Sequence, residues 1–223
     1  MTPNQVTAAR VLAAFAAVAL FALSADALAP GIVAVLLTIA AIALDGVDGY
    51  LARTRGLVTA LGAQFDILGD RVVENLFFTF FAVSGLVTFW VPVLFFVRGT
   101  LVDFLRGLAA RTGRSGFGRN SMLETWWGRA LVASRASRAA YAVLKCVCFC
   151  YLGLLLPLRH LPAALNDAWL GISVAHWLLS AGQILTGVTV TFCLVRAIPV
   201  IWEGRRYLSD RKQSKAVAVA VTR

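Results

Sequence analysis

Four aspartates with regular spacing are the residues of this sequence best suited to chemistry. Asp45 and Asp48 are three residues apart, and Asp66 and Asp70 are four residues apart. Residues at these spacings share one face of a helix, so each pair projects from a single helix face. Gly62 lies four residues before Asp66 and belongs to the same face as the second pair. The spacing therefore predicts two carboxylate pairs on two neighbouring helices.

Carboxylates gathered in this way need cations. Like charges at one point repel, and a buried carboxylate without compensation is strongly disfavoured. Ligation by oxygen alone selects hard ions, so we expect two divalent cations, Mg²⁺ or Mn²⁺, which could bridge the oxygens of a pyrophosphate. Two-metal sites support phosphoryl-type chemistry. Gly49, Ala52 and Gly62 leave room for a nucleotide beside the aspartates, and Arg53 offers a positive fork for phosphate.

Composition places these aspartates in a membrane protein. Of 223 residues, 60% are hydrophobic and 14% are charged, and the mean hydropathy is +0.80. Apolar runs of about 20 residues, long enough to cross the hydrocarbon core as helices, alternate with charged segments. We therefore expect an all-α integral membrane domain over residues 1–208 and a basic tail over residues 209–223. Six transmembrane helices are predicted, at about residues 6–23, 31–51, 60–89, 90–108, 139–158 and 170–201.

The basic residues predict the orientation of these helices. Lysines and arginines fall in one set of connecting segments, whereas the opposite turns hold only Arg159. By the positive-inside rule, both termini are expected in the cytoplasm, with the aspartates facing the cytoplasmic side of a bacterial-type inner membrane. The segment 111–138 is too polar to cross and is predicted to be a loop with short helical pieces. The net charge of +10 is thus explained by a membrane surface, and nucleic acid is not an expected partner.

The 26 residues from Asp45 to Asp70 carry the pattern Asp-x2-Asp-Gly-x2-Ala-Arg-x8-Gly-x3-Asp-x3-Asp. This pattern resembles the signature of the CDP-alcohol phosphotransferase family. The opening of the chain, with Pro3, Asn4, Thr7 and Arg10, also resembles the start of that family's phosphatidyltransferase branch. The resemblance implies transfer of a phosphatidyl group from CDP-diacylglycerol to a small alcohol, with release of CMP. Enzymes that make phosphatidylglycerophosphate or phosphatidylinositol phosphate are the relatives it suggests.

The resemblance also implies roles for single residues. The metals would be held by all four aspartates, and Asp70 would also deprotonate the acceptor hydroxyl. The nucleotide site would be lined by Asn4, Thr7, Asp48, Gly49, Ala52, Arg53 and Gly62. Asn4 and Thr7 could equally act only as caps of the first helix. A homodimer is expected from the same resemblance.

Arginines later in the chain form a candidate site for the acceptor. Arg98 lies about eight residues from the outer end of its predicted span, so its charge should face a polar cavity. A phosphorylated acceptor needs cations, and the candidates are Arg98, Arg106, Arg135 and Arg138. The loop arginines could equally serve only to orient the chain in the membrane.

An ion- or proton-coupled transporter that uses the buried aspartates is the alternative function. All four aspartates are expected at one face of the membrane, beside glycines that leave space for a nucleotide. The sequence also shows no internal repeat of the kind found in many transporters. Both features favour the enzyme.

Overall fold

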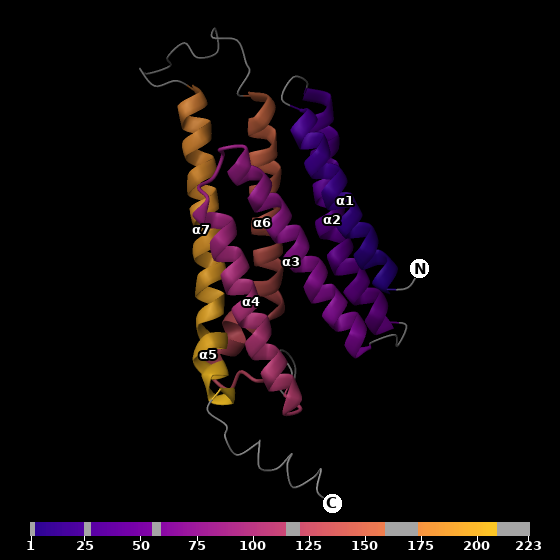
Figure 1. Ribbon diagram of the computed structural model, residues 1–223, viewed down its shortest axis with the longest axis vertical. Coiled ribbons are helices and arrows are strands. Elements are labelled where there is room, and N and C mark those ends of the chain that lie inside the picture. Colours follow the sequence, from indigo (N-terminus) through magenta and orange to yellow (C-terminus); the bar gives the residue numbers. More distant parts are fainter. Residues whose placement is uncertain (1–2, 25–27, 55–58, 115–120, 159–173, 209–223) are drawn as a thin grey trace, which may run out of the picture. The chain divides into compact units, whose positions relative to one another are not determined.

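The computed structural model describes residues 3–24, 28–54, 59–114, 121–158 and 174–208, and these are helical or in short connections (Figure 1). The expected all-α class is confirmed for this part of the chain. Its α-helices are α1 (Pro3–Leu23), α2 (Leu28–Thr54), α3 (Ala60–Val83), α4 (Trp90–Arg111), α5 (Trp126–Gly128), α6 (Arg135–Leu158) and α7 (Val174–Gly204). A π-helical turn (Arg129–Ala133) follows α5, and a 3-10 turn (Arg205–Tyr207) follows α7.

Four of these helices are long and apolar enough to cross a membrane, and they are α1, α2, α6 and α7. The apolar stretches are Asn4–Leu23, Ala29–Gly46, Arg135–Pro157 and His176–Tyr207. The helices α3 and α4 are as long, but charged side chains interrupt both. Asp66, Asp70, Arg71 and Glu74 lie in the first two thirds of α3, and Arg98, Asp103 and Arg106 lie along α4. Within the described residues, apolarity thus supports four of the six predicted spans.

The third predicted helix is shorter in the structure than the sequence indicated. Residues 60–89 were expected as one span, but α3 ends at Val83. Gly85 takes a left-handed φ of 68°, and the N–H of Leu86 donates to the carbonyl of Phe81 at 2.9 Å. This is a Schellman motif, which closes a helix at a residue that tolerates positive φ. Residues 84–89 therefore form the turn into α4.

The segment 111–138 contains the short helical pieces that were predicted for it, α5 and the π-helical turn. The next helix, α6, begins at Arg135, four residues before the predicted start of the fifth span at residue 139. Pro157 lies inside the last turn of α6. The start predicted for the sixth span, residue 170, falls outside the described residues, as does the whole basic tail predicted over residues 209–223.

One compact unit comprises residues 1–96 and 142–190. Its core is aromatic: Phe77 of α3 stacks on Phe149 of α6 with ring centroids 4.6 Å apart, and Phe78 meets Phe95 of α4 at 4.2 Å. The helix α1 packs along both α2 and α3. This packing brings the polar first half of α3 beside the first turns of α1.

A second compact unit comprises residues 97–141 and 191–223. Among its described residues, an apolar core is formed by Val102, Ala109, Met122, Leu123, Val132, Ala197 and Val200. Glu203, at the end of α7, is fully buried and accepts hydrogen bonds from the backbone N–H of Glu124 at 2.5 Å and from the hydroxyl of Thr125 at 2.5 Å. These bonds tie the start of α5 to the end of α7.

Candidate active site

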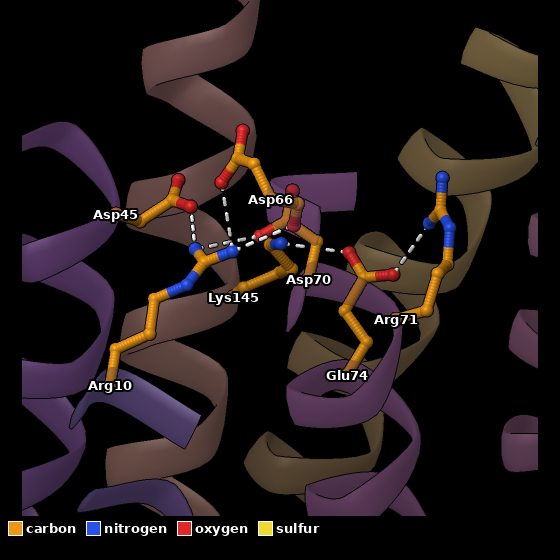
Figure 2. Close-up of polar contacts among 7 residues, drawn as sticks. All are labelled: Arg10, Asp45, Asp66, Asp70, Arg71, Glu74 and Lys145. Carbon is orange, nitrogen blue, oxygen red and sulfur yellow. Dashed lines mark hydrogen bonds and ion pairs between the residues drawn. The ribbon is translucent and has the colours of Figure 1, made fainter. Parts of the chain in front are cut away.

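Three of the four aspartates contact one guanidinium group, that of Arg10 (Figure 2). Its Nη1 contacts Oδ1 of Asp45 and lies 3.1 Å from Oδ1 of Asp70, and its Nη2 lies 3.0 Å from Oδ1 of Asp66. The same Nη2 donates to the backbone carbonyl of Asp66 at 2.8 Å. The structure therefore brings Asp45 of α2 together with Asp66 and Asp70 of α3, around an arginine from α1.

Burial differs sharply between the arginine and the carboxylates. The Arg10 side chain is 2% exposed, whereas those of Asp45, Asp66 and Asp70 are 35%, 45% and 41% exposed. Figure 2 shows the second carboxylate oxygens of Asp45 and Asp66 pointing away from the guanidinium. The guanidinium thus lies beneath an acidic surface whose outer side is accessible.

The fourth aspartate, Asp48, lies in α2, three residues after Asp45. The side chains of Asp48, Gly49, Ala52 and Arg53 are outside the described part of the structure. Their roles in binding metal and nucleotide remain predictions.

The acidic group fits a divalent cation in donor type and in charge. Three carboxylates against one guanidinium leave an excess of two negative charges, and oxygen donors are those that Mg²⁺ and Mn²⁺ prefer. Within the described ranges, however, no three acidic, His or Cys side chains are spaced to coordinate one ion together. The guanidinium of Arg10 contacts each of these three carboxylates.

Two glycines of α3 let α1 approach closely enough for these contacts. A Cβ at Gly62 would lie 3.2 Å from Oδ1 of Asn4, and a Cβ at Gly69 would lie 2.9 Å from both Nη2 of Arg10 and Cγ2 of Thr7. The structure thus places Asn4 next to Gly62. Thr7 is 3% exposed and packs within the interface between α1 and α3.

Gly69→Ala is expected to disturb this interface. The added methyl group must push against Arg10 and Thr7 because the spacing is already below van der Waals contact. Overpacking of this kind destabilises proteins by about 1–3 kcal/mol. Thermal unfolding in detergent measures the change, with Gly107→Ala of α4 as the matched control because no atom lies within 4 Å of a Cβ there. If the two variants unfold alike, the close approach at Gly69 is not important for stability.

An accessible hollow of about 360 Å³ adjoins this interface. It is lined by Asn4, Gln5 and Ala8 of α1 and by Phe65 of α3. Phe65 directly precedes Asp66 in α3.

A second charged group lies one helical turn beyond Asp70. Glu74 is 3% exposed, and its carboxylate pairs with Nζ of Lys145 at 2.7 Å and with Nη1 of Arg71 at 2.8 Å (Figure 2). Lys145 comes from α6, so this pair links α6 to the helix that carries Asp66 and Asp70. The sequence does not predict this pair, because nothing in the local pattern relates residues 71 positions apart.

Two of the four predicted acceptor arginines lie near a buried arginine of α7. Arg196 is 6% exposed, and both Arg98 and Arg138 are close enough to act on it electrostatically. Its Nη1 donates to the carbonyl of Leu131 at 3.1 Å and to the hydroxyl of Ser137. Arg98 is 9% exposed, and its Nε has no hydrogen-bond partner. Arg98 and Arg138 therefore lie within electrostatic range of Arg196 in the second unit.

The other two acceptor candidates are Arg106 and Arg135. Arg106 lies 3.9 Å from Asp103 on its own helix, and Arg135 is exposed at the start of α6.

Arg196 and Arg10 were not assigned roles from the sequence. A usable signal existed for Arg10, since it is the only charged residue of α1, and a lone charge in an apolar helix requires a partner.

Neighbouring arginines change the pKa of Glu124, an exposed residue outside the apolar helices. The hydrogen bond from Arg206 at 2.7 Å, together with its charge, lowers the pKa of Glu124, and Arg114 at 3.1 Å adds to this. Such an exposed cluster contributes little to stability.

The helices and the acidic group together define a multi-pass membrane protein with a charged centre at the packing of α1, α2 and α3. The family model for CDP-alcohol phosphatidyltransferases matches residues 1–188, and the chain belongs to this family. It is therefore an enzyme of phospholipid synthesis, and the family's activity is phosphatidyl transfer from CDP-diacylglycerol to an alcohol. Comparison with curated proteins gives no match.

Proposed function

We propose that this enzyme transfers the phosphatidyl group of CDP-diacylglycerol to a small phosphorylated alcohol, with release of CMP and dependence on divalent metal. The observation that carries the proposal is the meeting of Asp45, Asp66 and Asp70 at one accessible acidic surface. These are three of the four aspartates of the signature, in a chain that belongs to the family. Membership also favours the enzyme over the transporter.

The aspartates would hold the divalent ions. Asp45, Asp48, Asp66 and Asp70 are the proposed ligands of two Mg²⁺ or Mn²⁺ ions, which when bound would neutralise charge on the pyrophosphate of the donor. Asp70 is proposed to accept the proton of the acceptor hydroxyl, since a hydroxyl is a poor nucleophile at neutral pH and a carboxylate is a suitable base. The nucleotide is proposed to contact Asn4, Thr7, Asp48, Gly49, Ala52, Arg53 and Gly62.

The acceptor is proposed to carry a phosphate bound by arginines of the second unit. Arg98, Arg106, Arg135 and Arg138 remain the candidates, and Arg196 joins them through its proximity to Arg98 and Arg138. The support is the buried Nε of Arg98, a donor that lacks a partner and so is available to an anion. Glycerol 3-phosphate and inositol phosphate are such acceptors, as used by phosphatidylglycerophosphate and phosphatidylinositol-phosphate synthases.

Arg98→Gln tests the acceptor site. Loss of a charge-assisted hydrogen bond to phosphate is expected to raise the KM for the phosphorylated acceptor about 10–100-fold, because such bonds contribute about 1.5–3 kcal/mol. The KM for CDP-diacylglycerol should stay unchanged. Arg111→Gln, at the exposed end of the same helix, is the control for loss of positive charge. Equal effects of Arg98→Gln on both substrates would argue against an acceptor role.

We also propose that all six long helices cross the membrane, with both termini and the active site on the cytoplasmic side of an inner membrane, and that the enzyme is a homodimer. The charges of α3 are compatible with a membrane position because Asp66 and Asp70 pair with Arg10, and Glu74 pairs with Arg71 and Lys145.

One assay tests the function as a whole. Purified protein in detergent is supplied with CDP-diacylglycerol, Mg²⁺ or Mn²⁺, and single acceptors: glycerol 3-phosphate, inositol phosphate, serine, phosphatidylglycerol or choline. CMP release is expected with a phosphorylated acceptor and should stop when EDTA removes the metal. If no acceptor gives CMP and the protein moves ions or protons in liposomes, the transporter is the correct function.

A further inference from the structure

Arg10 is the least exposed member of the acidic site and touches all three described aspartates of it. We propose that Arg10 is a positioning residue for the metal ligands. It holds Asp45, Asp66 and Asp70 from the buried side by one oxygen each and leaves their other oxygens for divalent ions. This inference rests on the proposed function, in which the aspartates bind metal.

The geometry separates an inner and an outer side of the site. The Arg10 guanidinium contacts Oδ1 of each of these carboxylates, and the second oxygens of Asp45 and Asp66 point away from it (Figure 2). The carboxylates are about one-third to one-half exposed, although the guanidinium is buried. An ion approaching from outside therefore meets carboxylate oxygens before it meets Arg10.

Electrostatics explains why such a cation is useful before metal binds. Three carboxylates this close repel one another, and they would separate or take up protons without compensation. A guanidinium is planar, remains charged at any physiological pH and presents several donors at fixed angles, so it can hold three acceptors in one arrangement. Residues that orient metal ligands from behind in this way typically change metal affinity about 10–100-fold when they are replaced.

The position of Arg10 is itself enforced by its surroundings. Gly69 leaves the space that its Nη2 occupies, and the buried Nε has no hydrogen-bond partner. The hydrogen bonds of this buried cation are therefore concentrated on the two Nη atoms that face the aspartates. A side chain needed only for packing between helices would not require a buried charge, which is expensive without such partners.

Mn²⁺ binding to the full-length protein in detergent tests the proposal without relying on activity. Titration followed by electron paramagnetic resonance of free Mn²⁺ gives the dissociation constant. Arg10→Gln is expected to raise this constant about 10–100-fold. Arg10→Lys keeps the charge but loses the planar fork, so its increase should be smaller. Arg71→Gln is the matched control, because it removes an arginine that pairs with Glu74, and its Mn²⁺ affinity should equal that of the wild type.

The outcomes are distinct. A role in stability alone would lower the unfolding temperature of Arg10→Gln in EDTA and leave the dissociation constant unchanged, which overturns the proposal. Tighter Mn²⁺ binding by Arg10→Gln would show that the arginine competes with the ion, and this also overturns it. If Arg10→Gln does not fold, Arg10→Lys must still bind Mn²⁺ more weakly than the wild type. A wild type that neither binds Mn²⁺ nor releases CMP would instead contradict the proposed function.

Discussion

Asp70→Asn is expected to reduce the rate of CMP release at least about a thousandfold while the protein remains folded. General-base catalysis contributes about 10²–10⁴-fold, and loss of a metal ligand adds to that. The amide of asparagine has the same shape as the carboxylate, and its Oδ1 can still accept from Nη1 of Arg10, which lies 3.1 Å away in the wild type. The loss should therefore appear in kcat rather than in folding.

Two further variants serve as references for the rate of Asp70→Asn. Glu124→Gln makes the same chemical change at an exposed carboxylate bound by Arg114 and Arg206, and it should retain the wild-type rate. Asp66→Asn should weaken Mn²⁺ binding, whereas Asp70→Asn should lower the rate more than its effect on Mn²⁺ binding explains. A near wild-type rate for Asp70→Asn would remove Asp70 as the base.

Glu74→Ala should produce the largest loss of stability among the substitutions considered for this chain. Removing the carboxylate leaves Lys145 and Arg71, whose side chains are only 13% and 20% exposed, without the partner they hold at 2.7 and 2.8 Å. Breaking a buried ion pair from one side destabilises proteins by about 3–5 kcal/mol. For a chain of this size, that corresponds to a fall of roughly 6–20 °C in the unfolding temperature.

A double substitution distinguishes loss of the Glu74–Lys145 ion pair from loss of side-chain volume at position 74. Glu74→Leu combined with Lys145→Met replaces the ion pair by apolar side chains of similar volume and should recover much of the stability lost in Glu74→Ala. Light scattering during heating, or loss of the monodisperse peak in gel filtration, follows unfolding in detergent. If Glu74→Ala unfolds within about 2 °C of the wild type, the pair contributes no more than an exposed salt bridge does.

The helices were largely predictable from the sequence because their signals are local. Runs of apolar residues predicted α1, α2, α6 and α7 as long helices, and the structure has them at similar positions. Helix ends were less predictable. The end of α3 at Val83 depends on the φ of a single glycine, Gly85, in a run that is otherwise apolar.

The site was predictable in part for the same reason. The spacing of Asp66 and Asp70 is a local signal, and helix geometry places both on one face. The contacts of Arg10 are not local, since they join residues 56 and 60 positions apart. They depend on the close packing of α1 against α3, which Gly62 and Gly69 permit. The periodicity of the sequence does not predict how closely two helices pack.

The solitary arginine of α1 also bears on how this protein is made. Synthesis proceeds from the N-terminus, so α1 leaves the ribosome before either of the helices that carry its three acidic partners. Its charge has no acidic partner until Asp45 of α2 has been added, and all three partners are present only after Asp70. A lone cation in hydrocarbon is costly. The first helix therefore cannot reach its final depth and packing by itself, and we expect the first three helices to settle into the bilayer as one assembly.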